Sequence, residues 1–459
     1  MTYLGSQVDF VESALPYRVA GQVQAIGGLT IEASDLALPV GSLCRIVSFG
    51  GRESVAEVIG FQHDRTLLMS LESSAGVARG DRVENLAAAP TVNCTHRLLG
   101  RVLNGLGKPV DGRQPLPMGT RRRIDARSVA PMSRINIDQP ISTSIRAVDA
   151  LHTCGLGQRM GIFSGPGVGK STLLGQIAKH TSADVSVVSL VGERGREVQE
   201  FLQKILGEEG LRRCVVVVST GDEAPLLRVR SVKVACTIAE YFRDEGMNVL
   251  LLVDSITRMC HAQRQIGLAA REPPATKGYP PSVFGLLPQI LERAGRSQRG
   301  SITGFYTILV EGDDFNEPIA DAVKGIVDGH VWLSRSLANR SHFPAIDVLQ
   351  SISRVRGDVV AAEQLAHAKR VLGLTAVYQD IEDLVNIGAY VPGVNPEFDL
   401  SVQSRQRILQ FLQQDSASPL KMEQSVRQLA ELSAWIDQLE RALRAQAQKS
   451  RPAPAGAGK

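Results

Sequence analysis

A glycine-rich segment between a predicted strand and a predicted helix has the residue types that bind phosphate. The segment Ser164–Thr172 reads SGPGVGKST; it follows the apolar run Met160–Phe163 and precedes the helical run Leu173–His180. Glycines let backbone N–H groups turn toward phosphate oxygens, and the start of a helix adds its positive end. The P-loop motif begins with glycine where this chain has Ser164, a residue small enough for the same turn.

The same loop supplies side chains that could bind a nucleoside triphosphate and its Mg²⁺. Lys170 would reach the β- and γ-phosphates as a point charge, and Ser171 would give a hydroxyl ligand to the metal. The expected nucleotide-binding residues of the loop are Gly165, Pro166, Gly167, Val168, Gly169, Lys170, Ser171 and Thr172. A chance Gly-Lys-Ser in a turn is the alternative, and the flanking strand and helix argue against it.

Two carboxylates follow two further apolar runs. Asp254 comes directly after Val249–Val253, and Glu193 follows Val185–Val191. Ligands bind at the carboxyl ends of parallel strands, so Asp254 is expected to anchor Mg²⁺ as a Walker-B residue. Glu193 could orient the water that attacks the γ-phosphate. The alternative for Glu193 is an ordinary solvated loop, because charged loops after strands are common.

These motifs resemble those of the catalytic subunits of rotary ATPases. The segments that carry the resemblance are GERGRE at 192–197, LLVDS at 251–255, EPPATKGYPPS at 272–282, DDFNEPIADAVKGIVD at 313–328 and SRV at 353–355. Within that superfamily the chain is most similar to the ATPases of type III protein export, particularly those of the flagellar branch. The likeness covers about residues 18–415.

The resemblance implies roles that spacing alone does not give. The catalytic residues it implies are Lys170, Glu193, Arg194 and Arg354. Glu193 would be the catalytic carboxylate, with Arg194 beside it near the γ-phosphate. Ser171 and Asp254 would serve the metal. Phe343 stands where the family has an aromatic residue against adenine.

Arg354 falls at the arginine-finger position of the resembled family. Phosphoryl transfer develops negative charge, and a finger that stabilises this charge contributes about 10³–10⁵ in rate. If Arg354 reaches the nucleotide of a neighbouring subunit, the contact is head-to-tail and must close into a ring. The alternative is a local ion pair with Asp358.

Around these motifs the sequence predicts an α/β protein with three folded domains. The expected parts are a partner-binding segment at 1–17, a small β-barrel at 18–92, a RecA-like P-loop ATPase domain at 93–357 that begins with a connector at 93–140, a helical C-terminal domain at 358–448 and a disordered tail at 449–459. Short β-rich stretches with frequent turns indicate the barrel. Continuous apolar strands that alternate with helices indicate a parallel sheet covered on both faces.

Three segments leave alternatives open. Residues 1–17 could dock onto a partner or form a frayed terminus. The run Arg121–Arg123 is expected in a solvated loop of the connector, with a polyanion site as the alternative. The apolar stripe Leu429, Leu432, Ile436, Leu439 and Leu443 is expected to pack on its own domain, or else on a partner helix.

Composition excludes several classes of protein. With 43% apolar and 21% charged residues among 459, the chain can bury a large core, which excludes global disorder. The net charge of 51 − 47 = +4 is too small to indicate nucleic-acid binding. Six scattered cysteines indicate buried thiols rather than disulfides or zinc. No apolar run approaches the ~18 residues of a membrane span, and no signal peptide is evident, so we expect a cytoplasmic protein.

The expected function is Mg-ATP hydrolysis by a homohexameric ring that energises flagellar protein export through a type III apparatus and releases chaperone-bound substrates. The resemblance implies ATP and Mg²⁺ as cofactors, a stator-like regulator at the N-terminus, a central stalk protein, export chaperone–substrate complexes and a membrane export gate. It places the protein in the cytoplasm, peripherally at the inner membrane. No nucleic-acid partner is expected.

Other functions remain open at this point. They are an injectisome ATPase, a catalytic subunit of a rotary ATP synthase, a hexameric nucleic-acid motor and a catalytically inactive scaffold. A motor would need several aromatic residues on the barrel, whose predicted strands offer only Phe49 and Phe61. The intact Lys170, Glu193 and Asp254 argue against a scaffold.

Overall fold

The computed structural model describes residues 19–449 except Asp35, Ser73, Ala88, 127–128, 311–316 and Ala417. The expected segment at 1–17, nearly all of the 449–459 tail and the start of the 313–328 motif lie outside the described residues. The chain divides into two compact units. The first comprises Met1–Asn136, Gly157–Phe163 and Ala183–Val327, and the second Ile137–Leu156, Ser164–Ser182 and Asp328–Lys459.

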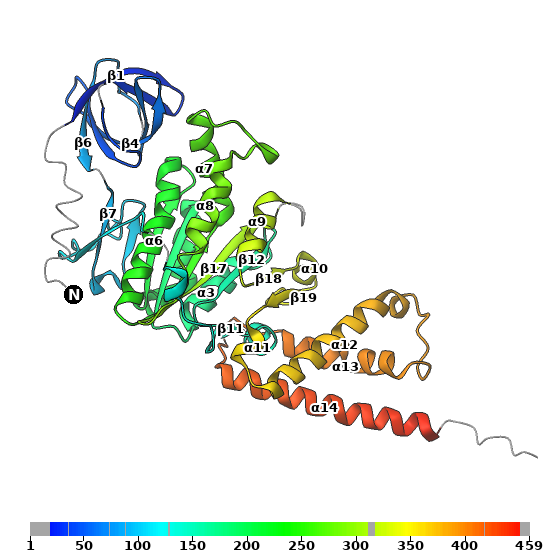
Figure 1. The fold of residues 1–459 in the computed structure, drawn as a ribbon. Helices are drawn as coiled ribbons and strands as arrows, with labels where there is room; N and C mark the ends of the chain where they lie inside the picture. Colours follow the sequence, from blue (N-terminus) through cyan, green and yellow to red (C-terminus); the bar gives the residue numbers. More distant parts are fainter. Residues whose placement is uncertain are drawn as a thin grey trace, which may run out of the picture. The chain divides into compact units, whose positions relative to one another are not determined.

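A closed β-barrel begins the first unit (Figure 1). Its six strands within the described residues follow the order β1-β2-β5-β4-β3-β6. Their bounds are β1 Ala20–Gly27, β2 Thr30–Ser34, β3 Leu43–Val47, β4 Glu53–Gln62, β5 Arg65–Ser70 and β6 Arg82–Ala87. Alternate residues of β2 and β3 are buried, because a strand turns every second side chain inward. The expected barrel is confirmed.

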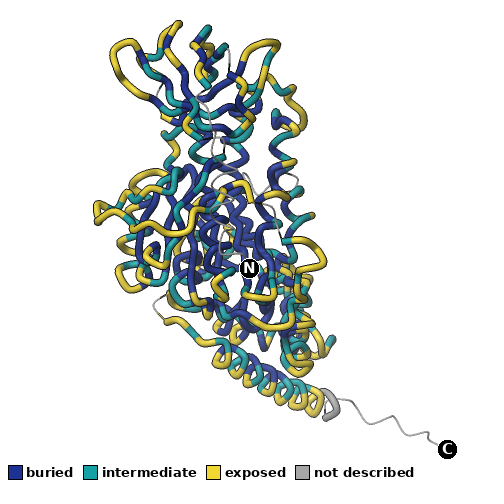
Figure 2. Tube along the Cα trace, turned by 60° about the vertical axis from the view of Figure 1, so that its left-hand side comes forward, coloured by how far each residue is buried: buried dark blue, intermediate teal, exposed yellow. Residues whose placement is uncertain are grey.

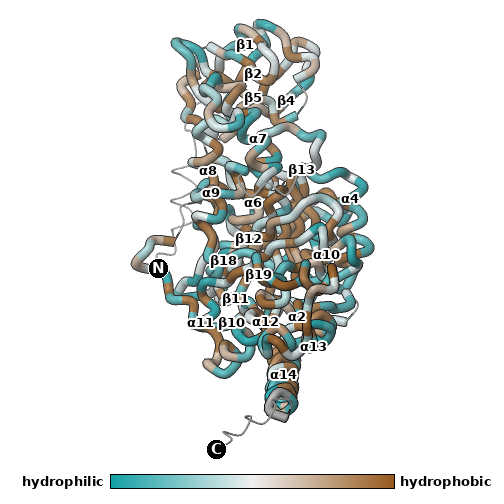
Figure 3. Tube along the Cα trace, turned by 90° about the vertical axis from the view of Figure 1, so that its right-hand side faces the viewer, coloured by the Kyte–Doolittle hydropathy of each residue, from teal (hydrophilic) through white to brown (hydrophobic). Residues whose placement is uncertain are grey.

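A largely parallel sheet follows in the first unit, with the order β12-β17-β15-β13-β14-β8 and the short β16 paired to β17. The strand bounds are β8 Val102–Asn104, β12 Arg159–Ser164, β13 Val185–Glu193, β14 Cys214–Thr220, β15 Asn248–Asp254, β16 Gly295–Arg296 and β17 Ser301–Leu309. β13 is buried along its whole length, as expected for a strand covered on both faces. Figure 2 shows buried residues running through the interior, and Figure 3 shows mainly hydrophobic residues there. The expected parallel sheet is confirmed.

Helices of the first unit pack on this sheet, with α6 against β13, β14 and β15 and α7 against β17. The bounds are α4 Gly195–Glu200, the π-helical turn Phe201–Leu206, α5 Gly207–Arg212, α6 Pro225–Asp244, α7 Ile256–Ala269, α8 Pro281–Leu291 and α9 Pro318–Ile326. α6, α8 and α9 each begin with proline, which fits the first turn of a helix because the N–H group it lacks has no partner there.

The expected solvated connector is partly ordered, which corrects the prediction for Arg121–Arg123. β7, Thr91–Cys94, pairs antiparallel with β9, Thr120–Arg123, so the arginine run lies in a strand. Arg122 forms an ion pair with Asp244 of α6, and its guanidinium lies 5.4 Å from the ring centroid of Tyr241. The strand results from pairing with β7 rather than from an apolar pattern of its own.

The second unit contains the P-loop and a group of long C-terminal helices. Its elements are β10 Pro140–Ile141, α2 Arg146–Leu151, β11 Cys154–Gly155, α3 Lys170–His180, β18 Gly329–Leu333, α10 Arg335–Asn339, β19 Ile346–Ser353, α11 Arg356–Val359, α12 Ala362–Asn386, α13 Pro396–Leu412 and α14 Met422–Lys449. β18 and β19 pair antiparallel. α12, α13 and α14 pack against one another (Figure 1).

The C-terminal apolar stripe packs on its own unit, as expected. Leu429, Leu432 and Ile436 are buried, and Leu439 and Leu443 are half-buried. α14 contacts α2, α12 and α13, which cover this face of the helix. The first part of the stripe is therefore not a free surface for a partner helix.

The cysteines are free and buried, as the sequence analysis expects. Burial raises the pKa of Cys94 and of Cys214 to about 12, so these thiols are protonated and unreactive at neutral pH. In the part of the chain that the structure describes, no helix has the length and apolar character needed to cross a bilayer.

The ordered connector gives a testable prediction at Asp111. Arg101 donates two hydrogen bonds to the Asp111 carboxylate, at 2.6 and 2.9 Å, and both side chains are nearly buried. These bonds lower the pKa of Asp111 from 3.8 to about 2, so the ion pair stabilises the fold above pH 4 and this contribution is lost as the pH falls toward 2. We expect Asp111→Asn to destabilise this segment at pH 7 by about 2 kcal/mol.

Hydrogen exchange of the amides of residues 100–114 measures this effect locally. The loss of protection should shrink when the comparison is made near pH 3, where part of the wild-type carboxylate is protonated. Asp64→Asn, at an exposed turn of the barrel, is the matched control. Equal protection of wild type and Asp111→Asn at pH 7 would contradict the role of this ion pair.

Candidate active site

The P-loop leads into α3 in the second unit. Gly167 and Gly169 have φ angles of 78° and 86°, a left-handed conformation that side chains disfavour. Gly169 is the N-cap of α3, and as a glycine it has no side chain that could cap the helix. The first N–H groups of α3 therefore keep the arrangement that suits an anion.

The expected phosphate-binding and metal-binding side chains lie in the first turn of this helix. Lys170 is its first residue and is half-buried, whereas Ser171 and Thr172 are exposed. Ser164, which replaces the first glycine of the motif, is fully buried at the end of β12, and its Oγ has no hydrogen-bond partner among the described residues.

The remaining expected loop residues differ in exposure. Gly165 and Val168 are buried, while Pro166 and Gly167 are exposed. The buried Val168 fixes the loop to the interior, and its exposed glycine neighbour leaves the backbone accessible.

A cavity of about 450 Å³ opens beside the P-loop and is lined by the aromatic residue expected to contact adenine. Gly167, Gly169, Thr172 and Phe343 all line this cavity, which we call the base cavity, and a Cβ on Gly169 would lie 3.5 Å from the Phe343 ring. Phe343 is 46% exposed, so its ring offers a face on which a planar base can stack. The volume suits a nucleoside base.

Gln414 and Arg146 hold the wall of the base cavity, and the sequence analysis did not select either residue. The Gln414 backbone N–H donates to the carbonyl oxygen of Phe343 at 2.9 Å. Its side-chain amide accepts a bond from the Arg146 backbone N–H at 2.8 Å and donates to the carbonyl oxygen of Ser144 at 2.9 Å. The Arg146 guanidinium donates to the Phe411 carbonyl at the end of α13 and lies over the Phe411 ring. Arg146 therefore caps α13 directly before the residues that line the cavity.

The two predicted carboxylates lie together at one edge of the sheet in the first unit. Glu193 is the last residue of β13, and Asp254 is the last residue of β15. These strands are parallel neighbours, with Leu190 opposite Asp254. Glu193 is 9% exposed and Asp254 is 4% exposed, so both belong to a largely desolvated edge. Asp254 accepts a hydrogen bond of 2.8 Å from the Thr307 hydroxyl.

Arg258 binds Glu193 and is a further residue that the sequence analysis missed. The Arg258 Nε lies 3.3 Å from Oε1 of Glu193, and Nη2 lies 3.4 Å from Oε2. Gly192 makes room for this contact, since a Cβ there would lie 2.9 Å from the Arg258 Cδ. Arg258 is in the first turn of α7, where its N–H donates to the N-cap Ser255. The sequence signal that could have identified Arg258 is its position four residues after Asp254, within the first turn of the helix that follows the strand.

The two other expected arginines are exposed. The Arg194 side chain is 79% exposed and lies 3.4 Å from Glu197. Arg354 follows β19, and its backbone N–H donates to the Asp328 carbonyl at 3.0 Å. Within the described ranges no carboxylate pairs with the Arg354 guanidinium, so the local pair with Asp358 does not form.

Each unit offers an oxygen donor of the kind that Mg²⁺ uses together with a nucleotide. Within the described part of the chain, no cluster of three or more His, Cys, Asp or Glu side chains could bind a metal alone. Mg²⁺ commonly uses one or two protein oxygens along with substrate phosphates and waters. The exposed Ser171 hydroxyl and the Asp254 carboxylate are oxygen donors of this kind.

Comparison with known proteins identifies the family. Residues 23–87 match the β-barrel domain and residues 144–353 the nucleotide-binding domain of the ATP synthase alpha/beta family, and residues 360–431 match the T3SS EscN ATPase C-terminal domain. The flagellum-specific ATP synthase of Bacillus subtilis is 47% identical over 431 residues, which are 93% of this chain and 98% of that protein. The chain belongs to the type III secretion ATPases of the ATP synthase alpha/beta family.

Solved structures of this ATPase family share the fold. The assembled ATPase EscN of the enteropathogenic E. coli type III secretion system matches with a TM-score of 0.86 and 42% identity, over 90% of this chain and 100% of that one. EscN in complex with its central stalk EscO matches with a TM-score of 0.83, 42% identity and the same coverage. The expected order of barrel, RecA-like domain and helical domain is confirmed, while the exact domain boundaries stay predictions.

The contacts of Arg146 predict a defect in nucleotide binding. Arg146→Ala removes the cap of α13 and loosens the wall of the base cavity, so we expect the KM for ATP to rise about tenfold. kcat should change less than twofold, because the cavity wall binds the substrate and the transition state alike. Steady-state ATPase assays measure both constants. Arg441→Ala, on the exposed side of α14, is the control. A lower kcat at unchanged KM would contradict this role.

Proposed function

We propose that this chain is the ATP hydrolase that energises flagellar protein export through a type III apparatus. The observation that carries the proposal is the base cavity beside the P-loop, in a chain that matches a flagellum-specific ATP synthase over nearly all of both sequences. An injectisome ATPase is the second candidate, favoured by the likeness to EscN. The flagellum-specific relative of Bacillus subtilis is 47% identical over 93% of this chain, whereas the SPI-2 type 3 secretion system ATPase of Salmonella typhimurium is 46% identical over 86%, so the greater coverage supports the first.

In the proposed reaction, the P-loop binds the triphosphate of ATP. Gly165–Thr172 would enclose the phosphates with backbone N–H groups, and Lys170 would add its charge at the β- and γ-phosphates. Ser171 and Asp254 would hold Mg²⁺, which neutralises charge on the phosphates when it is bound. Phe343 would stack on adenine. The exposed hydroxyl of Ser171 and the exposed ring face of Phe343 support these roles.

Glu193 would orient the attacking water. A carboxylate has about four lone-pair sites, so the ion pair with Arg258 leaves Glu193 able to accept a bond from water. Arg258 would fix the direction of the carboxylate, and Arg194, one residue further along, would approach the γ-phosphate. The burial of Glu193 supports this role, because a desolvated carboxylate keeps a defined orientation.

Arg354 would complete the site of a neighbouring copy as the arginine finger. Its exposed position after β19 supports this role. Each copy would then contribute its own P-loop and lend its guanidinium to the next, which requires a closed homo-oligomer. We propose a hexameric ring, and the matching structure of an assembled EscN supports an oligomer.

The proposed partners follow from this assignment. A central stalk protein would bind the ring, as the structure of EscN with its central stalk EscO supports. Residues 1–17 would bind a stator-like regulator, and the ring would receive chaperone–substrate complexes and feed a membrane export gate. The protein would act in the cytoplasm, peripherally associated with the inner membrane. A nucleic-acid motor is not supported, since the net charge is only +4.

The ring with a finger in trans predicts a defined pattern of activity. Specific ATPase activity should rise cooperatively with protein concentration, and Lys170→Ala should lose at least 100-fold. Arg354→Ala should lose about 10³-fold or more. Asp358→Ala, which changes an exposed carboxylate near Arg354, should keep wild-type activity.

Mixed rings separate action in trans from action in cis. Glu193→Gln and Arg354→Ala are each expected to be inactive alone, whereas an equal mixture should recover part of the activity. Recovery occurs because some interfaces then combine an intact Glu193 with an intact Arg354. Absence of recovery in rings shown to be mixed would rule out the finger in trans.

Secretion assays distinguish the two export systems. Deletion of the gene should abolish export of flagellar filament protein and motility, and the wild-type gene should restore both. Lys170→Ala should fail to restore them although the protein is present at wild-type level. Normal flagellar export in the deletion strain, together with a loss of effector secretion, would favour the injectisome candidate.

A further inference from the structure

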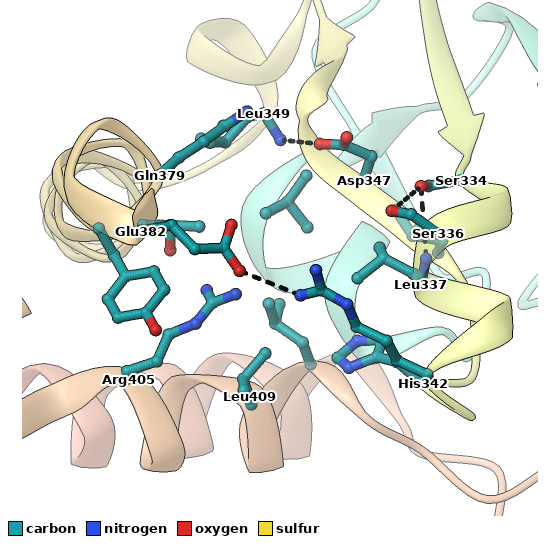
Figure 4. Close-up of a pocket in the computed structure, with 16 residues that line it drawn as sticks. Ser334, Ser336, Leu337, His342, Asp347, Leu349, Gln379, Glu382, Arg405 and Leu409 are labelled. Atoms are coloured by element: carbon teal, nitrogen blue, oxygen red, sulfur yellow. Dashed lines mark hydrogen bonds and ion pairs between the residues drawn. The ribbon is translucent and has the colours of Figure 1, made fainter. Parts of the chain in front are cut away.

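We propose that a second cavity in the second unit binds a compact anionic group, either a phosphate or a carboxylate. The cavity has a volume of about 130 Å³ and is lined by residues of α10 and the loop after it and by residues of β19, α12 and α13 (Figure 4). We call it the arginine cavity. None of the residues assigned above to nucleotide binding lines it, so it is distinct from the base cavity.

Arg405 of α13 is the main reason to expect an anion. Its guanidinium is half-buried and lies 4.4 Å from the ring centroid of Tyr378 of α12. Within the described ranges, this guanidinium has no hydrogen-bond acceptor and no carboxylate within ion-pair distance. Burial without an acceptor is costly for a cation, and a guanidinium presents paired N–H groups that match a carboxylate or a phosphate.

Neither carboxylate of the cavity forms an ion pair with Arg405. Arg340 pairs with Glu382 at 3.1 Å. Asp347 uses Oδ1 to accept the N–H groups of Leu349 and Gln350, and Figure 4 shows it apart from Arg405, beside Leu349. At the end of the cavity where Arg405 lies, Glu382 pairs with Arg340 and attracts Arg405 only from beyond ion-pair distance. One further negative charge would complete this cluster.

His342 adds a second, independent sign of a ligand. Its side chain lines the cavity and the residue is only 4% exposed, yet no hydrogen bond to its imidazole is found among the described residues. Burial, with a smaller effect of Arg405, lowers the pKa of His342. The ring is therefore neutral at pH 7 and can donate one N–H bond to an acceptor in the cavity.

The size of the arginine cavity limits what it can bind. Its 130 Å³ accommodates a phosphate group or a carboxylate with a few carbon atoms, whereas the base cavity is more than three times larger. A second nucleotide would not fit. The arrangement of Arg405, Arg340 and the His342 ring suits one oxyanion that accepts bonds from several donors.

The test measures anion binding to the full chain after the P-loop has been saturated with a non-hydrolysable ATP analogue. Inorganic phosphate and acetate are titrated separately by calorimetry at pH 7. We expect saturable binding to one site for at least one of them, and at least tenfold weaker binding in Arg405→Gln. Arg407→Gln is the matched control, because Arg407 lies on the same helix but stacks on Trp435, 4.4 Å from its ring centroid.

The outcomes are distinct. Binding of phosphate alone assigns the site to phosphate groups, binding of acetate alone assigns it to carboxylates, and loss of either in Arg405→Gln supports the proposal. Absence of saturable binding by both anions, or equal binding by wild type and Arg405→Gln, overturns it. If Arg405→Gln does not fold, Arg405→Lys keeps the charge but loses the planar fork, and it should weaken binding while the thermal unfolding midpoint stays near that of wild type.

Discussion

The backbone conformation at the start of α3 is the constraint on which the phosphate site depends. The positive φ of Gly169 turns the chain into the helix, and this glycine has no side chain that could bond to the first turn. A helix start of this kind favours an anion, so the loop suits a phosphate group. The contacts around the base cavity in the second unit add to this arrangement of the P-loop.

Contacts remote from the phosphates hold the base cavity in shape. Arg146 caps the end of α13, and Gln414 transmits that position to the Phe343 carbonyl through its backbone N–H. In the first unit, Arg258 and Gly192 do the equivalent for Glu193, one by an ion pair and the other by leaving space. In both places a residue outside the proposed reaction holds a residue that takes part in it. Gln414 holds Phe343, and Arg258 holds Glu193.

Local signals in the sequence predicted much of the fold and the positions of Glu193 and Asp254 at the ends of strands. Glu193 and Asp254 end their strands because each apolar run stops there. Contacts between distant segments could not be predicted in this way. Arg146 and Gln414 are 268 residues apart, and β9 is a strand only because β7 lies beside it. The local pattern of residues around Arg146 or within β9 does not indicate which distant residues will contact them.

One stretch of backbone connects two binding surfaces. His342 faces the arginine cavity and its neighbour Phe343 faces the base cavity, so the two side chains cannot be restrained independently. A ligand in one cavity that fixes the peptide between His342 and Phe343 therefore also restricts the side chain that lines the other cavity. Thermodynamic linkage then requires the effect to be mutual. If a ligand in one cavity changes the binding free energy of a ligand in the other, the second changes that of the first by the same amount.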